Sequence, residues 1–457
     1  MIQFQKISLY LGPALALALG LFLQSLGWQS DTAVTAAVAV LCAVWWIFEP
    51  IPIPATSLIP LAGFPLLGVL DGNQIALSYG SPLIVLLMGG FILSTAMERS
   101  GAHRLLALNI IKIIGGRSDR LVVIGFAVSA AFLSMWISNT ATVLMLLPIA
   151  LAVLQNSENK ALRIPLLLAI CYCASVGGVG TPIGTPPNLI FMRVYKETTG
   201  TEISFLQWMG LALPVVIIFV PLITLWLTRN LKNELTVHIP TTEAWTPEQK
   251  RVIAVFVLTA IAWMTRKAPF GGWSGVLDIP TANDAAVALT AVITMFIIPN
   301  GKGGRLLDWE TANRIPWGIL LLFAGGIALA KAFVSSGLAE IIANALTGLT
   351  VFHTLLMILL LCLMVTFLTE VTSNTATTSL LMPVLAAAAF ATEIDPMLLM
   401  VPAAMSASCA FMLPVATAPN AIIFGSGEVP IQRMVREGLA LNFLGVTIIS
   451  LVCYFSI

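Results

Sequence analysis

Long apolar stretches separated by short polar segments run along the whole chain. Such stretches lie at 9–28, 32–48, 55–70, 83–97, 121–137, 141–154, 164–179, 205–228, 252–264, 285–298, 317–333, 354–368, 376–391, 397–413 and 439–454. A helix needs about 20 apolar residues to cross a hydrocarbon core roughly 30 Å thick. The pattern predicts an all-α polytopic membrane protein, in which the shorter stretches form broken helices or re-entrant segments.

Composition supports a location in the membrane. Of 457 residues, 58% are hydrophobic and 9% are charged, with 22 basic and 21 acidic side chains, whereas soluble domains are usually about 25% charged. The largest polar stretch, 229–251, has mixed charge and is expected to be a linker. Basic residues at 99–120 and 229–251 are accompanied by acids, so charge alone indicates the orientation only weakly. The six cysteines have no paired spacing, which favours reduced packing residues over a metal cluster.

Three sequence blocks occur twice, in the same order. LLMGGFILSTAMERSG (86–101) resembles LLFAGGIALAKAFVSSG (321–337), MWISNTATVLMLLP (135–148) resembles EVTSNTATTSLLMP (370–383), and TPIGTPPNLIF (181–191) resembles LPVATAPNAIIF (413–424). Ser138 and Ser373 are 235 positions apart, and Asn188 and Asn420 are 232 apart. This near-constant offset predicts two homologous halves with a binding site between them near the membrane midplane. The sequence leaves open whether the halves are parallel or inverted.

Each Ser-Asn-Thr cluster separates two apolar runs. Such side chains are favoured at helix N-termini, where their oxygens accept hydrogen bonds from unpaired backbone amides. We therefore expect a helix to be interrupted within the membrane and to begin again at each cluster. The free amides of a helix start suit an anion, and the carbonyl oxygens of unwound backbone suit a hard cation such as Na⁺.

The two Pro-Asn turns add further expected helix starts, with Asn188 and Asn420 as candidate caps. Neither Ser-Asn-Thr block contains Lys or Arg, so a bound dianion would need another source of positive charge. This favours co-transport of an anion with cations over an anion pore lined by Arg or Lys.

Simpler interpretations exist for each feature. Ser and Thr in membrane helices often bond only to a carbonyl one turn earlier. The Gly-Gly pairs at 89–90 and 325–326 fit either close helix packing or hairpins. Glu370, beside the second cluster, is a candidate proton or cation group, although the first half has no acid there. Duplication in register favours a functional role for the clusters.

The duplicated motifs, together with WWIFEPIPIPATSLIPL (45–61), resemble the divalent anion:sodium symporter family, the dicarboxylate, citrate and sulfate carriers that include the INDY-type proteins. The resemblance implies a homodimer with inverted repeats, re-entrant hairpins and a transport domain that moves against a scaffold by an elevator mechanism. Its implied divisions are 1–82 (scaffold), 83–228 (first transport repeat with lateral helices), 229–251 (linker), 252–316 (scaffold) and 317–457 (second transport repeat and C-terminal helix).

Site residues follow from the same resemblance. The first sodium ion would be held by Ser134, Ser138, Asn139 and Gly184, and the second by Thr369, Ser373, Asn374 and Ala416. Substrate carboxylates would contact Ser138, Asn139, Thr140, Ser373, Asn374 and Thr375, with Thr185 and Thr417 close by. One position departs from the family pattern, because Ala418 stands where the first half has Pro186.

The resemblance implies a carrier in the cell (inner) membrane that couples Na⁺ to uptake of a C4-dicarboxylate such as succinate, malate or fumarate. Sulfate transport and sodium-independent dicarboxylate exchange remain alternatives. No HExxH motif, paired Asp or phosphate-binding Gly-rich signature indicates an enzyme. A channel fits less well than an occluded site built from broken helices, and no nucleic-acid partner is expected.

Overall fold

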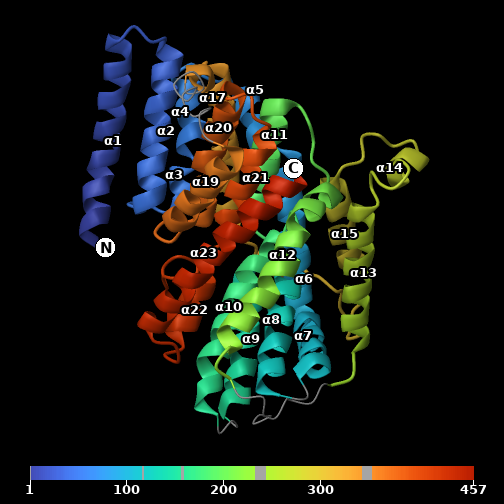
Figure 1. The fold of residues 1–457 in the computed structure, drawn as a ribbon. Coiled ribbons are helices and arrows are strands. Elements are labelled where there is room, and N and C mark those ends of the chain that lie inside the picture. The colour runs from blue at the N-terminus through green and yellow to red at the C-terminus, as the bar shows by residue number, and fades with distance from the viewer. Residues whose placement is uncertain (1, 116–117, 156–158, 232–242, 342–352) are drawn as a thin grey trace.

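The computed structural model describes residues 2–115, 118–155, 159–231, 243–341 and 353–457, which form helices and no named β-strand (Figure 1). Seven helical segments in these ranges are long and apolar enough to cross a membrane. They are Gln5–Ser25, Ser30–Phe48, Gly72–Ser100, Lys160–Val179, Phe205–Thr228, Trp317–Ser335 and Ile431–Ser456. The predicted polytopic all-α fold is therefore confirmed.

The helices of the first half are α1 (Ile2–Ser25), α2 (Ser30–Phe48), α3 (Ile53–Thr56), α4 (Ile59–Leu66), α5 (Gly72–Tyr79), α6 (Pro82–Ser100), α7 (Ala102–Gly115), α8 (Asp119–Ser134), α9 (Asn139–Gln155), the 3₁₀ turn η1 (Lys160–Leu162), α10 (Arg163–Val179), α11 (Pro186–Thr199) and α12 (Phe205–Thr228). Those of the second half are α13 (Pro247–Met264), α14 (Gly272–Val276), α15 (Asp284–Ile297), α16 (Trp309–Ala312), α17 (Trp317–Ser335), α19 (Thr354–Thr369), α20 (Asn374–Ala391), α21 (Pro396–Ser406), α22 (Ala418–Gly425) and α23 (Ile431–Ser456).

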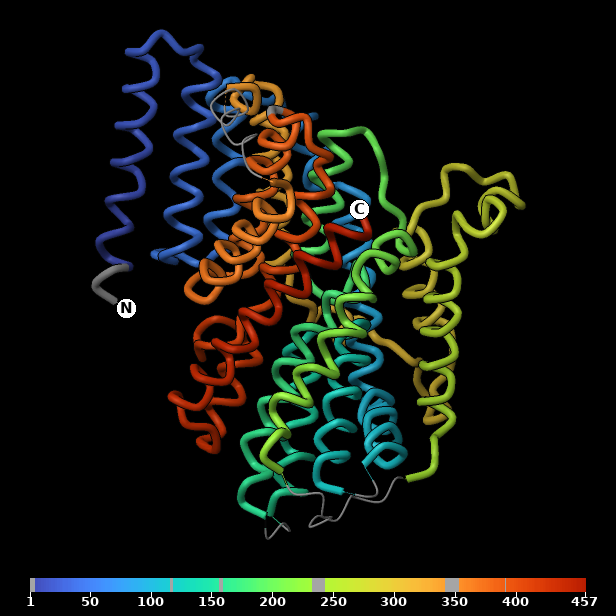
Figure 2. Tube along the Cα trace, in the orientation of Figure 1, coloured from blue at the N-terminus to red at the C-terminus, as the bar shows by residue number. Residues whose placement is uncertain are grey.

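Helix packing forms two groups that meet along α11, α17 and α20. In one group α17 packs against α2 to α5, and α6 packs against α13 and α15. In the other, α10 packs against α8 and α12, while α19 and α21 pack against α23. The halves also interlock, because α9 packs against α22 and α20 packs against α11 (Figure 2).

Two of the expected boundaries differ in the structure. The stretch at 55–70 is not one helix, because the proline-rich sequence divides it between α3 and α4, with Pro52 as the N-cap of α3. The last helix begins at Ile431, directly after Pro430, and not at 439, since polar residues of its first turns continue the helix beyond the apolar run.

The Gly-Gly pairs lie inside the uninterrupted helices α6 and α17, so their interpretation as hairpins is wrong and their interpretation as packing positions is confirmed. A Cβ on Gly89 would lie 2.7 Å from the Cβ of Ala288, and a Cβ on Gly325 would lie 2.7 Å from the carbonyl oxygen of Ser57. Any larger residue would therefore push the neighbouring backbone away.

The hairpins lie instead at the Ser-Asn-Thr clusters. Helix α8 ends at Ser134 and α9 begins at Asn139, while Asn159 Nδ2 donates to Asp119 Oδ2 at 2.9 Å and joins the far ends of the pair. Helices α19 and α20 make the equivalent turn between Thr369 and Asn374. In Figure 1 the open end of the α8–α9 hairpin lies at the lower edge of the molecule, and that of the α19–α20 hairpin lies in the upper part.

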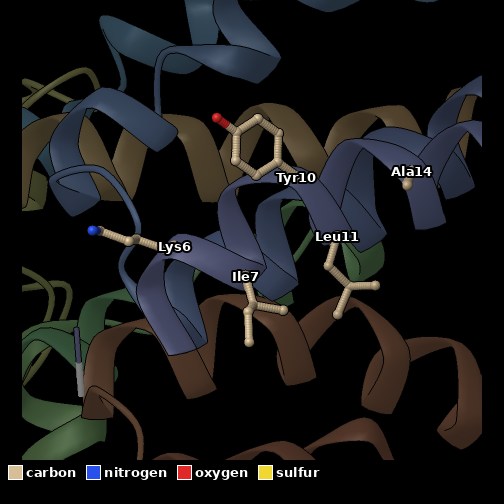
Figure 3. A pocket seen from close by; sticks show the side chains of 5 residues that line it. All are labelled: Lys6, Ile7, Tyr10, Leu11 and Ala14. Carbon is tan, nitrogen blue, oxygen red and sulfur yellow. The ribbon is translucent and has the colours of Figure 1, made fainter. Parts of the chain in front are cut away.

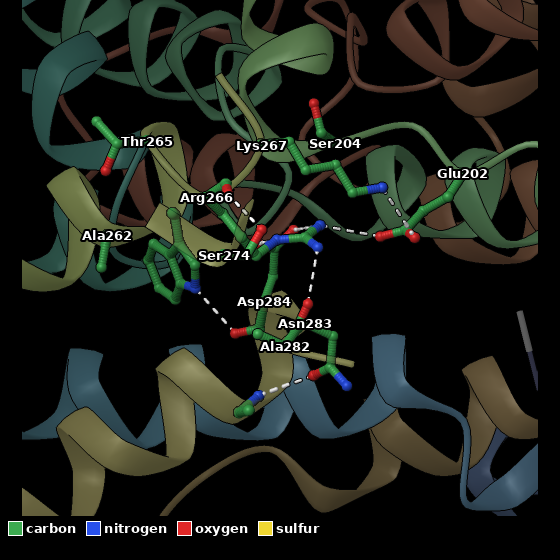
Figure 4. Close-up of polar contacts among 12 residues, drawn as sticks. Glu202, Ser204, Ala262, Thr265, Arg266, Lys267, Ser274, Ala282, Asn283 and Asp284 are labelled. Carbon is green, nitrogen blue, oxygen red and sulfur yellow. Dashed lines mark hydrogen bonds and ion pairs between the residues drawn. The ribbon is translucent and has the colours of Figure 1, made fainter. Parts of the chain in front are cut away.

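An ion cluster, here called the Glu202 cluster, ties the α11–α12 linker to α13 and α15 (Figure 4). Arg266 Nε bonds Asp284 Oδ1 at 2.6 Å and its Nη2 bonds Glu202 Oε1 at 2.9 Å, while Lys267 Nζ lies 3.2 Å from Glu202 Oε2. Burial raises the pKa of Glu202, but hydrogen bonds from Arg266 and Lys267 outweigh this, so the pKa lies below its usual value. The carboxylate therefore stays ionised at neutral pH, and its stabilising contribution is lost only as the pH falls through that lowered pKa.

Replacing Arg266 with methionine should destabilise the protein strongly, because Arg266 is only 3% exposed and its loss leaves Asp284 buried without its partner. We expect a loss of about 3–5 kcal/mol, measured as a lower thermal unfolding midpoint in detergent. The matched control is Lys267→Met, whose side chain is 44% exposed and whose ion pair should contribute about 0–1 kcal/mol. Equal midpoints for the two variants would contradict this account.

Candidate functional site

Both Ser-Asn-Thr clusters and both Pro-Asn turns line one cavity of about 910 Å³, here called the central cavity. The residues predicted for the substrate all lie in its wall: Ser138, Asn139, Thr140, Thr185, Ser373, Asn374, Thr375 and Thr417. Gly184 and Ala416, predicted for sodium, are in the wall as well, whereas Ser134 and Thr369 are buried and absent from the lining. The structure thus brings together residues that are more than 230 positions apart in the chain.

Four helices begin at this cavity. Helices α9 and α20 start at Asn139 and Asn374, while α11 and α22 start directly after Thr185 and Thr417. Ser138 Oγ accepts from Ala141 N at 3.1 Å, which makes this serine an N-cap as predicted. Ser373 also lies at the N-cap of α20, but the capping hydrogen bond predicted for its side chain is not formed. Each start points the positive end of a helix dipole to the cavity, an arrangement that favours an anion. The starts of α9 and α20 also carry backbone N–H groups at their first positions, whereas Pro186 and Pro187 of α11 have none.

Oxygen atoms of the first half converge behind Asn139. Ser134 Oγ donates to Asn139 Oδ1. A Cβ on Gly178 would lie 2.6 Å from Asn139 Oδ1 and 3.2 Å from the carbonyl oxygen of Gly184, and a Cβ on Gly184 would lie 3.0 Å from the carbonyl oxygen of Ser134. Glycine at these two positions therefore lets the oxygens approach the backbone more closely than a side chain would allow, and carbonyl, amide and hydroxyl oxygens are ligands that suit a hard cation.

The second half repeats the hydroxyl-to-amide contact of the first, with alanines in place of the two glycines. Thr369 Oγ1 lies 2.7 Å from Asn374 Oδ1 and 3.0 Å from the carbonyl oxygen of Ala407. Ala410 and Ala416 stand where the first half has Gly178 and Gly184, so two methyl groups occupy the corresponding positions. The two oxygen sets come from equivalent sequence positions, but the second half carries two methyl groups that the first half lacks.

Asn188 and Asn420 brace the interrupted backbone, and the prediction that they cap α11 and α22 is wrong. Asn188 Nδ2 donates to the carbonyl oxygens of Gly178 at 3.0 Å and Thr181 at 2.7 Å, and Asn420 Nδ2 donates to those of Ala410 at 3.1 Å and Leu413 at 2.9 Å. Each asparagine is the third residue of its helix and reaches back to carbonyls that the preceding helix has released. Thr417 is the cap of α22, since its Oγ1 accepts from Asn420 N at 3.2 Å.

Glu370 also stabilises unwound backbone, which argues against a transported proton or cation at this carboxylate. Its Oε1 accepts from Phe411 N at 2.8 Å and Met412 N at 2.9 Å, and its Oε2 accepts from Leu413 N at 3.0 Å. Asn442 Nδ2 of α23 adds a bond of 2.7 Å to Oε1. Four donors thus hold one buried carboxylate between α19, the α21–α22 break and α23.

The cavity wall also contains charged residues that the sequence reasoning missed. Glu49, Glu98, His103 and Arg314 line it, and Arg314 is the only Lys or Arg among the described lining residues. Arg314 is already paired with Glu310 at 2.7 Å. No local motif marks these four positions, because they reach the cavity only through the packing of helix ends from several elements.

A second pocket, on the outer face of α1, is a poor candidate. It is lined by Lys6, Ile7, Tyr10, Leu11 and Ala14, all from this one helix (Figure 3). Figure 3 shows Ile7 and Leu11 on one side of the helix and Tyr10 on the other, with no convergent polar groups. Tyr10 is 76% exposed, as expected for a side chain that faces lipid.

Comparison with known proteins identifies the family of this chain. A family model described as a citrate transporter (CitMHS) matches residues 43–404. Two bacterial relatives, each named sodium-dependent dicarboxylate transporter SdcS, align over 99% of this chain and 91% of their own length. The protein of Staphylococcus saprophyticus is 38% identical and that of Staphylococcus aureus strain USA300 is 39% identical.

The chain belongs to the divalent anion:sodium symporter family. Family membership confirms a multi-pass membrane transporter and not an enzyme. The fold is also similar to the crystal structure of the YdaH transporter of Alcanivorax borkumensis, with a TM-score of 0.59 over 93% of this chain and 99% of that chain. At 14% identity, this likeness concerns the fold alone.

Adding one methyl group at Gly184 tests the oxygen set of the first half. Gly184→Ala places a Cβ against the carbonyl oxygens of Gly178 and Ser134, and overpacking of this kind costs about 1–3 kcal/mol. We expect the sodium concentration for half-maximal uptake to rise at least about fivefold. The reciprocal variant Ala416→Gly removes a methyl group and should change that value less. An unchanged sodium titration in Gly184→Ala would show that these oxygens hold no cation.

Glu370→Gln should lower the thermal unfolding midpoint of the purified protein. Glutamine has the same shape, but its terminal NH₂ group cannot accept hydrogen bonds from backbone amides, so a buried amide loses its partner at a cost of about 1–3 kcal/mol. Glu393→Gln, on an exposed residue after α20, is the control and should leave the midpoint unchanged. Matching midpoints would mean that Glu370 does not hold the α21–α22 break.

Proposed function

We propose that this protein couples sodium to the transport of a dicarboxylate. The single observation that carries the proposal is the meeting of four helix starts and two related oxygen sets at the central cavity. The names of the SdcS relatives, sodium-dependent dicarboxylate transporters, agree with it. A dicarboxylate offers two separated negative groups, one for each pair of helix starts.

The charges of the site favour co-binding of anion and cation. Apart from Arg314, whose charge is matched by Glu310, the described lining contains no Lys or Arg, and it includes Glu49 and Glu98. Dipoles alone compensate a dianion poorly at membrane depth. Sodium ions beside Asn139 and Asn374 would supply the missing positive charge next to the carboxylates.

The substrate proposed here is a C4-dicarboxylate such as succinate, malate or fumarate, bound through Ser138, Asn139, Thr140 and their counterparts Ser373, Asn374 and Thr375, with Thr185 and Thr417 close by. Sodium would use Ser134, Ser138, Asn139 and Gly184 in the first half. In the second half it would use Thr369, Ser373, Asn374 and Ala416. A cavity of about 910 Å³ has room for such a molecule together with ions and water.

The transport movement is proposed to be an elevator motion of inverted repeats in a homodimer. Two observations support an inverted arrangement. The two hairpins open in opposite directions, and α9 and α11 of the first half pack against α22 and α20 of the second. The division into scaffold (1–82 and 252–316) and transport repeats (83–228 and 317–457) remains our prediction, with α8 to α12 and α19 to α23 as the helices that carry the site.

The distribution of basic side chains indicates the orientation. In the described ranges, Lys196, Arg266, Lys267 and Lys331 lie at or beside the C-terminal ends of α11, α13 and α17, helix ends that Figure 1 shows in its upper part. A larger set belongs to helix ends in the lower part: Arg99, Arg104, Lys112, Arg120, Lys160, Arg163, Arg229, Lys250, Arg251, Arg433 and Arg436. By the positive-inside rule we infer that the lower edge faces the cytoplasm.

Uptake into liposomes tests the proposal. The purified protein should accumulate labelled succinate under an inward sodium gradient and lose accumulation when the gradient is removed. Asn139→Ala and Asn374→Ala should each reduce uptake to background. Each variant removes an oxygen from the proposed substrate site and from the proposed sodium site of its own half. Asn313→Ala, at an exposed position after α16, is the matched control and should transport normally.

Competition identifies the substrate class in the same assay. Malate and fumarate should inhibit succinate uptake more strongly than sulfate or citrate. Stronger inhibition by sulfate would favour a sulfate carrier, and accumulation without sodium would favour an exchanger. Uptake that never exceeds the equilibrium level under a sodium gradient would contradict coupled transport.

A further inference from the structure

A small basic pocket lies where α10 and α23 begin and α12 ends, away from the central cavity. It has a volume of about 140 Å³, and Lys160, Arg229, Arg433 and Glu437 are its charged lining residues. We call it the Lys160 pocket. It joins the two halves, because η1, α10 and α12 belong to the first and α23 belongs to the second.

The charges in this region do not cancel. Arg229 pairs with Glu437 at 2.9 Å, and Glu437 Oε2 also accepts from Trp226 Nε1 at 2.9 Å. Among the described residues, Lys160 and Arg433 have no ion-pair partner. Within the described part of the chain, two cations on the wall of one small pocket therefore have no ion-pair partner.

Neighbouring groups add to the positive potential. Arg163 beside the pocket pairs with Glu428 at 2.6 Å, so that acid is not available to Lys160. Arg120 Nη2 donates to the carbonyl oxygen of Leu231 at 3.1 Å and covers the negative end of α12. Helix α23 begins after Pro430, which provides no side-chain cap, and its dipole points its positive end toward this region.

We infer a position near the lipid headgroups for the pocket from the residues at the end of α12. Trp226, on the last turn of α12, is 38% exposed, and the guanidinium carbon of Arg229 lies 4.1 Å from the centre of its ring. Tryptophan and arginine at a helix end are typical of the membrane interface. Farther along, α12 exposes Leu225 and α23 exposes Leu439 and Phe443, so apolar side chains for acyl chains continue from the pocket into the bilayer.

We propose that the Lys160 pocket binds the phosphate group of an anionic phospholipid of the cytoplasmic leaflet. A volume of about 140 Å³ corresponds to about five water molecules at roughly 30 Å³ each, which suits one phosphate group and not a whole lipid. Basic pockets between membrane helices at the cytoplasmic side bind such headgroups, and the inner leaflet supplies them. The bound lipid clamps the start of α23 to the ends of α10 and α12.

The test measures thermal unfolding of the purified full-length protein in detergent during titration with dioleoyl-phosphatidylglycerol, with dioleoyl-phosphatidylcholine and inorganic phosphate as parallel titrations. The variant Lys160→Gln/Arg433→Gln removes the two unpaired charges at exposed positions. Arg436→Gln is the matched control, because Arg436 is exposed on the same helix but does not line the pocket.

We expect phosphatidylglycerol to raise the unfolding midpoint of the unmodified protein and of Arg436→Gln. Each charge removed should raise the phosphatidylglycerol concentration needed for the same shift about fivefold. The double variant, which lacks two charges, should therefore need about 25-fold more. An equal shift with phosphatidylcholine or with inorganic phosphate, an unchanged response in the double variant, or no response in the unmodified protein would overturn the proposal. Should the double variant unfold without lipid, Arg433→Gln alone replaces it, with Arg433→Lys expected to restore the response.

Discussion

Backbone that leaves a helix within the membrane must find hydrogen-bond partners inside the protein, because lipid offers none. In this protein the partners include two asparagines and one carboxylate. Asn188 and Asn420 bond the carbonyls released at the two breaks, and Glu370 bonds three amides of the second break. The rest of the site depends on these braces, since they keep helix starts and carbonyl oxygens fixed around a cavity instead of letting each break rewind into a helix.

Equivalent side chains hold the two breaks, but the two halves differ in the small residues beside the oxygen atoms. Ser134 and Asn139 correspond to Thr369 and Asn374, and both pairs are joined by a hydroxyl-to-amide hydrogen bond. The first half has glycines at 178 and 184, where a Cβ would crowd oxygen atoms, and the second half has Ala410 and Ala416. Duplication therefore produced two related oxygen sets whose sizes differ by a methyl group at each of two positions.

Most basic side chains of this protein lie away from the duplicated clusters. The duplicated clusters hold no Lys or Arg, while basic side chains gather at helix ends. Arg314, the one described Lys or Arg of the cavity wall, is paired with Glu310, so the compensation of a bound dianion is left to ions that travel with it. Basic residues at the edge face headgroups, where their hydration costs little.

The sequence by itself determined the class of protein, the two duplicated sets of motifs and the Ser-Asn-Thr clusters that line the central cavity. Apolar length, residue spacing and helix-start preferences act locally, so the interruptions at Ser138 and Ser373 could be read from one stretch at a time. Only the tertiary structure decided that the Gly-Gly pairs pack inside straight helices and that Asn188 and Asn420 brace carbonyls. Likewise, only packing brought Glu98, His103 and Arg314 to the cavity and Arg433 to Lys160. Such contacts join positions up to several hundred residues apart, and no local pattern encodes which distant backbone or side chain will be the partner.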